Sequence, residues 1–322
     1  MPAPDPAAIE AVSDALQTTW RSFQTDEEER MRWQLDRFSD TLTRCRGALT
    51  PEEWRHMIDF RIRRHPVTDG FFQDPFTWRS FTKPRGYPGD AVLMDLIYHH
   101  ASTRALLDQT TPFGQALYRY TSDCESPRAV RARRDLLAAE LDRVGRQCPR
   151  PAHILALACG HLREAQQSAA VQSGALGRFL ALDQDAASIA VVEREQATKG
   201  VEALAAPIRT LLSEHKHQSL GTFDFVYAAG LFDYLSDRLA TRLLSAMFRL
   251  LNPGGKLWVS NFLPEIPDLG YMEALMDWWL VYRDAGQMEA LMAEIPSEQI
   301  GAHRVFTEPH RNVIFLEVVR NS

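Results

Sequence analysis

The sequence predicts an α/β protein with a Rossmann-like, mostly parallel sheet that ends in an antiparallel hairpin and follows an all-helical N-terminal domain. Up to about residue 149, apolar residues recur at the three- and four-residue steps of helices. From residue 150, short apolar runs alternate with helical stretches, which is typical of parallel strands covered on both faces. A chain of 322 residues is long for one core. We therefore expect two domains, residues 1–149 and 150–322.

The composition is that of an ordinary globular protein and argues against several classes of function. Hydrophobic residues make up 45% of the chain, and no apolar run reaches the roughly 18 residues that a membrane span needs. The N-terminus carries acids and prolines in place of a signal sequence. Residues 1–150 hold 22 basic and 22 acidic side chains, so the remainder carries the net charge of −6. We expect a cytoplasmic protein with neither a membrane nor a nucleic-acid partner.

The four cysteines give no indication of a metal site. Cys45, Cys124, Cys148 and Cys159 form no CxxC pair, and none has a histidine at metal-ligand spacing. We expect no bound metal and no disulfide.

Three helices begin with recognisable signals in the N-terminal region. Residues 9–23 place apolar side chains on one helical stripe. Residues 50–53 form a capping box with Pro51 at the first helical position. Residues 126–127 open a third helix that should stop near Gly145.

A long loop is predicted between these helices, over residues 69–90. It holds six aromatic residues and is therefore expected to be ordered. The loop ends in a turn at residues 86–89, after which Asp90 should cap a helix.

The C-terminal region contains the expected sheet. Four apolar runs predict parallel strands, at residues 153–157, 179–182, 225–228 and 256–260. Two further runs, at 302–306 and 313–319, flank a turn and predict the antiparallel hairpin.

The turn after the first strand has the features of a nucleotide-type binding site. Small residues at Ala158 and Gly160 would let the backbone approach a ligand closely. The following helix offers free N–H groups to a carboxylate. Asp183 ends the second strand 23 residues after Gly160, placed to accept hydrogen bonds from two ribose hydroxyls, and Asp185 should cap the next helix. By itself, this turn is equally typical of an α/β protein that binds no ligand.

Additional landmarks give this region a resemblance to a known family. With Asp183, residues 250–255 before an apolar strand, and the terminal hairpin, it resembles the class I methyltransferases that use S-adenosylmethionine (SAM), over nearly all of residues 150–322. The resemblance implies SAM as the cofactor. By position in the family, it implies cofactor contacts from Ala158, Cys159, Gly160, Arg163, Asp183, Gln184, Leu212, Ser213, Ala229 and Gly230.

The turn departs from the family's glycine-rich motif. Where the family usually has an acid and two flanking glycines, this chain has Ala156, Ala158 and Leu162. The contact to the methionine ammonium is therefore open between Glu164 and an acid of the N-terminal domain. Arg163 is expected to meet the methionine carboxylate.

A narrower resemblance joins the two regions. Residues 83–90, 160–164 and 229–235, with the stretch 261–283, are similar to bacterial methyltransferases of 3-hydroxypalmitic acid methyl ester biosynthesis. The resemblance implies an enzyme that methylates a carboxylate of a small, acidic acceptor. An N- or O-methyltransferase of another small metabolite and a catalytically inactive SAM-binding or interaction module are the alternatives.

The acceptor site is expected beyond the strands at residues 225–228 and 256–260. A carboxylate is ionised at neutral pH and needs no general base, and the sequence displays no obvious catalytic histidine. If residues 278–283 are helical, Trp279, Tyr282 and Arg283 share one face, and Arg283 would anchor the acid. The alternative is that Trp278 and Trp279 belong to the core and that Arg283 forms an ion pair at the surface.

Further candidates lie after the strand at residues 225–228 and in the aromatic loop. Asp233 or Tyr234 is placed to face the transferred methyl group, although Asp233 could instead cap the next helix, and Phe232 would line the acceptor site. Tyr87 is expected either to close over the site as a catalytic lid or to plug the space between the domains. The helical domain would cover the acceptor, mediate a homodimer, or do both.

Overall fold

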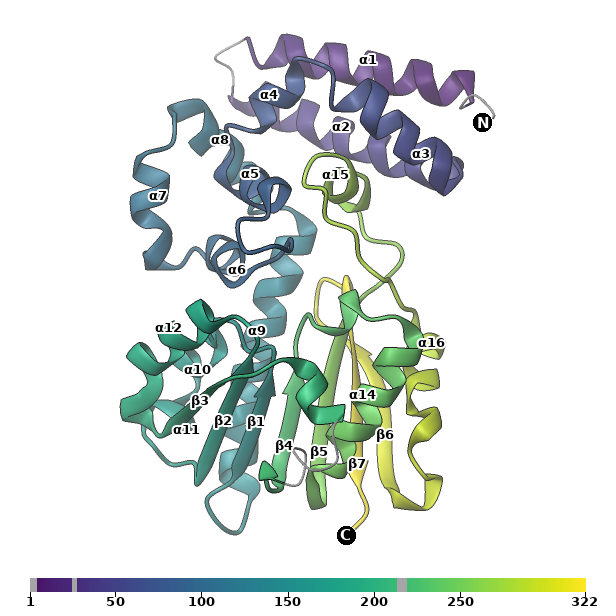
Figure 1. Ribbon diagram of the computed structural model, residues 1–322. Coiled ribbons are helices and arrows are strands. Elements are labelled where there is room, and N and C mark those ends of the chain that lie inside the picture. Colours follow the sequence, from purple (N-terminus) through teal and green to yellow (C-terminus); the bar gives the residue numbers. More distant parts are fainter. Residues whose placement is uncertain (1–4, 25–27, 213–218) are drawn as a thin grey trace. The chain divides into compact units, whose positions relative to one another are not determined.

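The computed structural model describes residues 5–24, 28–212 and 219–322, which fall into two compact units (Figure 1). The helical unit comprises Met1–Arg128 and Glu265–Trp279, and the sheet unit comprises Ala129–Pro264 and Leu280–Ser322. This division by contacts does not coincide with the boundary at residue 150, which stays a prediction about the independently folding parts of the chain.

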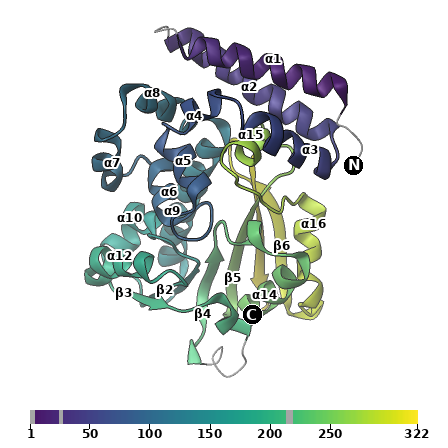
Figure 2. The ribbon, with the colours of Figure 1, turned by 45° about the horizontal axis from the view of Figure 1, so that its top comes forward.

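The helical unit is built from short helices around two longer ones. Helices α1 (Pro6–Ser22) and α2 (Glu28–Ala48) run side by side in both views of the ribbon (Figures 1 and 2). The capping box at Thr50 is confirmed, because its hydroxyl accepts from Glu53 N–H at the start of α3. The remaining helices are α3 (Pro51–Met57), α4 (Val67–Phe71), α5 (Pro75–Thr82), α6 (Ala91–Ile97), α7 (Arg104–Asp108), α8 (Pro112–Thr121) and α15 (Leu269–Ala274). None of the helices in the described part of the chain is long and apolar enough to span a bilayer.

The long loop predicted at residues 69–90 is wrong in its first half, which is helical. Asp74 caps α5 by accepting hydrogen bonds from Phe76 and Thr77 N–H, and a proline follows it at the first helical position. Phe72, Trp78 and Phe81 pack on one another within this segment, whose many aromatic residues gave it an irregular pattern in the sequence. Asp90 caps α6 as predicted, and its carboxylate forms a two-bond ion pair with Arg79 of α5 (2.8 and 2.7 Å).

The sheet unit has seven strands in the order β3-β2-β1-β4-β5-β7-β6 (Figure 1). Strands β1 to β5 pair in parallel, and β7 is antiparallel to both β5 and β6, so the predicted sheet and hairpin are confirmed. The strands are β1 (His153–Leu157), β2 (Arg178–Asp183), β3 (Val201–Ala205), β4 (Phe223–Ala228), β5 (Leu251–Phe262), β6 (Ile300–Thr307) and β7 (Val313–Arg320). Strand β3 was not predicted, because this edge strand is largely exposed and carries no apolar run.

Helices cover the sheet and complete its core. Helix α9 (Glu125–Gln147) leads into β1, and α14 (Asp237–Arg249) shares one hydrophobic cluster with strand positions two residues apart, such as Leu155 with Leu157 and Leu257 with Val259. Residues at that spacing share one face of a strand. The other helices of this unit are α10 (Arg163–Gln167), α11 (Ala169–Gln172), α12 (Ala186–Gln196) and α16 (Ala285–Ala290).

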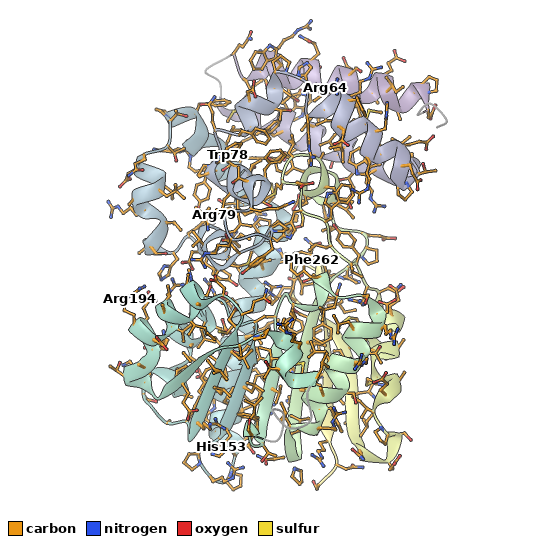
Figure 3. The ribbon with its side chains drawn as sticks, in the orientation of Figure 1. Arg64, Trp78, Arg79, His153, Arg194 and Phe262 are labelled. Atoms are coloured by element: carbon orange, nitrogen blue, oxygen red, sulfur yellow. The ribbon has the colours of Figure 1, made fainter. Side chains whose placement is uncertain are left out.

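The parallel strands bring several turns to one edge of the sheet. His153, at the start of β1, and Phe262, at the end of β5, mark the opposite edges (Figure 3). The turns that follow β1, β2 and β4 all lie at the carboxyl edge, where open parallel sheets bind their ligands. This edge contains most of the candidate site.

Candidate functional site

The turn after β1 has an unusual backbone. Ala158, Gly160 and Leu162 have φ angles of 48°, 53° and 52°, which lie in the left-handed region. That region costs a residue with a side chain roughly 1–2 kcal/mol, and such strain gathers at functional sites. Ala158 and Leu162 stand where the resembled family usually has glycine, so the glycine-like conformation is kept without the glycines.

The strain at Ala158 gives a testable contrast. Ala158→Val should lower the free energy of unfolding by about 2 kcal/mol, because a β-branched residue is a genuine outlier at positive φ. Ala158→Gly should change it by less than about 1 kcal/mol, since relief of strain offsets the entropy that glycine adds to the unfolded chain. Urea unfolding of both variants measures the difference. Equal stability of the two variants would contradict a strained turn.

Asp183 is held rigidly at the end of β2. Its side chain is buried, and its Oδ2 accepts from Gly160 N–H (2.8 Å) while Oδ1 accepts from Asp185 N–H (2.9 Å). Burial raises the pKa of this carboxyl, and the two backbone hydrogen bonds oppose the rise. Each oxygen keeps a second lone pair, so the carboxylate suits two ribose hydroxyls. Asp185 caps α12 as predicted, and the neighbouring Gln184 is exposed.

The two charged residues after the turn have different partners. Arg163 is buried and forms an ion pair with Glu195 of α12, so binding a methionine carboxylate would compete with that pair. Glu164 is also buried, and its Oε1 accepts from the hydroxyl of Tyr227 (2.7 Å). Burial raises the pKa of Glu164. An ammonium group beside this carboxyl would restore its ionised form, so Glu164 fits the methionine ammonium.

The end of β4 brings together the predicted glycine and an arginine that sequence reasoning missed. Ala229 and Gly230 are half-buried, and Gly230 has a φ of 92°. A Cβ added to Gly230 would lie 3.2 Å from Nη1 of Arg133, a residue of α9. A signal for Arg133 was present in the sequence: it lies three residues after Val130 and four before Leu137, on the apolar stripe of its helix.

Asp233 follows β4 and is buried. Its Oδ1 accepts from the N–H of Phe262 on β5 (2.7 Å), so it joins two strand ends instead of capping α14. Burial raises its pKa to about 6, against opposing effects of the Phe262 bond and of the charges on Arg133 and Arg283. Phe232 beside it is fully buried, whereas Tyr234 is 39% exposed.

The raised pKa of Asp233 makes stability depend on pH. The folded pKa of about 6 exceeds the unfolded value near 4, so the folded chain binds more protons between these values and loses stability as the pH rises from about 4 to about 6. Asp233→Asn should be more stable than the wild type by about 3 kcal/mol above about pH 7, with almost no difference at pH 4. Urea unfolding at several pH values tests this. Part of the slope should remain, because Asp74 of the helical unit also has a pKa raised to about 6. An unchanged slope would contradict the burial of a titrating Asp233.

The structure places Arg283 differently from the sequence-based expectation. Residues 277–284 are not helical, so the predicted shared helical face does not form. Arg283 is buried, and all five of its N–H donors have partners: the carbonyl oxygens of Phe232 and Leu235, Oδ1 of Asn261, and, through two donors, Oδ1 of Asp237. No donor remains for an acidic acceptor. Arg283 thus holds the ends of β4 and β5 together.

The other predicted acceptor residues are spread over both units. Trp279 belongs to the helical unit, where its Nε1–H donates to Asp277 and the guanidinium of Arg55 lies 4.3 Å from its ring centroid. Tyr282 is half-buried in the sheet unit. Tyr87 is half-buried in the turn of the helical unit, and its lid role stays a prediction.

Leu212, Ser213 and Cys159 complete the set of predicted cofactor residues. Leu212 ends a short 3₁₀ helix at the edge of the sheet core, and Ser213 lies outside the described residues. Cys159 is half-buried, and burial raises the pKa of its thiol. The described residues contain no group of three or more His, Cys, Asp or Glu side chains arranged to hold a metal ion.

Comparison with known proteins identifies the sheet unit. Residues 154–255, from β1 into β5, match the family described as a methyltransferase domain. The match covers the strained turn, Asp183 and the end of β4, which are the features that fit SAM, so the chain is an enzyme with SAM as its cofactor. A comparison with curated protein sequences finds no match.

One solved structure shows the same fold over nearly the whole chain, and two others are similar over a part of it. A possible exported protein from Bordetella parapertussis is similar over 99% of this chain and 100% of its own, with 17% identity and a TM-score of 0.62. Magnesium protoporphyrin IX methyltransferase from Synechocystis PCC 6803, with bound S-adenosylhomocysteine (SAH), is similar over 61% of this chain and 87% of its own, with 11% identity and a TM-score of 0.45. N-methyltransferase NodS from Bradyrhizobium japonicum WM9 is similar over 58% of this chain and 96% of its own, with 13% identity and a TM-score of 0.41.

Proposed function

We propose that this methyltransferase forms a methyl ester on a carboxylate of a small, acidic molecule. The observation that carries the proposal is that each carboxyl group at the strand ends accepts hydrogen bonds from the protein itself. Asp183 accepts from two backbone amides, Glu164 from Tyr227, and Asp233 from the Phe262 amide. These carboxyl groups therefore hold the strand ends in place, and we assign none of them the role of a general base. A carboxylate acceptor needs no general base, because it is already ionised at neutral pH.

The chain's own residues would contribute orientation and exclusion of water. SAM supplies an activated methyl group on a sulfonium. Asp183 would hold the ribose and Glu164 the methionine ammonium, which fixes the direction of the sulfur–methyl bond. Methyl transfer needs the acceptor nucleophile in line with the sulfur–methyl bond. Most of the catalytic effect would therefore come from aligning the acceptor with SAM in a site that excludes water. The resemblance to methyltransferases of 3-hydroxypalmitic acid methyl ester biosynthesis supports a hydroxy fatty acid as the first acceptor to examine.

A second candidate rests on Asp233. A buried carboxyl with a pKa near 6 at the end of β4 would serve as a general base for an amine or a hydroxyl acceptor. The chain would then be an N- or O-methyltransferase of a small metabolite.

One set of assays separates the two candidates. Methyl transfer from SAM is measured on a panel of hydroxy acids, aryl acids, amines and phenols, and kcat/KM for the preferred acceptor is followed from pH 5 to 9 in the wild type and in Asp233→Asn. Carboxylate methylation predicts a nearly flat profile above pH 6 and a loss of less than about tenfold in the variant.

A different profile would overturn the proposal. A rate that rises through an apparent pKa near 6 and falls by about 100-fold or more in Asp233→Asn would assign the base role to Asp233. Binding of SAH without turnover of any acceptor would favour an inactive SAM-binding module.

A further inference from the structure

Arg133 is a buried cation that forms no ion pair with any described residue. Its side chain is 5% exposed, and among the described residues it has neither a hydrogen bond nor an ion pair within 4.0 Å. Its charge lowers the pKa of both Glu164 and Asp233, so it lies in the field of two carboxyls without being bonded to either. A buried guanidinium without a bonded anion is costly, and such groups normally pair with one.

The place of Arg133 is the cofactor-binding edge of the sheet. A Cβ on Gly230 would lie 3.2 and 3.4 Å from its two terminal nitrogens, so the guanidinium covers the backbone at the end of β4. All these residues belong to the sheet unit. The absence of a side chain at Gly230 leaves the guanidinium its room.

We propose that Arg133 binds the carboxylate of the methionine part of SAM, with Glu164 binding its ammonium. The proposal rests on SAM as the cofactor and goes beyond it by naming the residue that recognises the amino-acid end. The ammonium and carboxylate of an amino acid share one carbon atom, so the cation that binds one must lie close to the acid that binds the other. Both side chains lie at the end of β4, because Glu164 accepts from the hydroxyl of Tyr227 (2.7 Å) and Arg133 lies against Gly230.

The other arginines of the edge are occupied. Arg163 pairs with Glu195, and Arg283 uses all five donors within the protein. Arg133 therefore replaces Arg163, which the sequence favoured for the methionine carboxylate. A guanidinium can bind this group through two parallel hydrogen bonds.

The test compares two ligands that differ in the amino-acid part. Calorimetry measures the Kd of SAH and of 5′-methylthioadenosine, which keeps adenosine and sulfur but lacks that part. In Arg133→Met, the affinity for SAH should fall about 100-fold, while the affinity for methylthioadenosine should stay within about threefold. Arg146→Met, an exposed arginine on the same helix, is the matched control and should change neither value.

The outcomes separate this proposal from its alternatives. An equal loss of both affinities would indicate general damage to the site and overturn it. Unchanged SAH affinity together with a raised KM for an acidic acceptor would assign Arg133 to the acceptor. If Arg133→Met fails to fold, Arg133→Lys keeps the charge and should weaken SAH about tenfold with methylthioadenosine unchanged. A wild type that binds neither ligand would instead refute the cofactor itself.

Discussion

Asp183→Ala is expected to weaken the binding of SAH by about 100-fold, or roughly 2–3 kcal/mol. The carboxylate is fixed by the amides of Gly160 and Asp185, so it meets the ribose hydroxyls without paying for side-chain ordering. Alanine removes both ribose hydrogen bonds. It also leaves the strained turn after β1 without the acceptor that holds Gly160. Calorimetry with SAH measures the effect.

Asp185→Ala is the control for this prediction. Asp185 lies in the same loop, but its carboxylate caps α12 by accepting from Ala187 N–H (3.0 Å). Its loss should cost about 1 kcal/mol of stability and leave the Kd of SAH nearly unchanged. Unchanged SAH affinity in Asp183→Ala would remove Asp183 from the cofactor site.

Arg283→Ala should have the largest effect on stability, a loss of about 3–5 kcal/mol in the free energy of unfolding. Alanine leaves the carbonyl oxygens of Phe232 and Leu235 and the Oδ1 of Asn261 without their donor in a buried region, and each unpaired group costs about 1–3 kcal/mol. Urea unfolding measures the loss.

A surface arginine provides the comparison for Arg283. Arg304 is an exposed strand residue paired with Glu317, and Arg304→Ala should cost less than about 1 kcal/mol. If Arg283→Ala is as stable as the wild type but has a raised KM for acidic acceptors, the anchoring role expected from the sequence would be restored.

The fold was predictable because its strongest signals are local. Buried parallel strands appear as short apolar runs, and Asp90 and Asp185 stand as helix caps directly before the helices they start. Strand β3 has no such run, because the edge of the sheet leaves most of it exposed. Helix α5 was hidden by its aromatic residues, although its Asp-Pro start was visible.

A site residue was predictable only where the sequence shows both its chemical type and its place at the end of a strand. Asp183 is an acid at the end of a strand, and both facts can be read from the chain. The role of Arg283 depends on how residues 277–284 cross the ends of β4 and β5, which is a tertiary arrangement without a local pattern. Arg133 lies on the apolar stripe of a long helix, which indicates burial, but its place against Gly230 is a tertiary contact that the sequence does not show.

A crystal structure of the complex with SAH tests the central claim most directly. We predict adenosine across the carboxyl ends of β1 and β2, with the ribose hydroxyls bonded to Asp183 and the homocysteine end between Glu164 and Arg133. SAH bound at another place, or strand ends filled by packed side chains with Asp183 turned away from the ligand, would contradict the account.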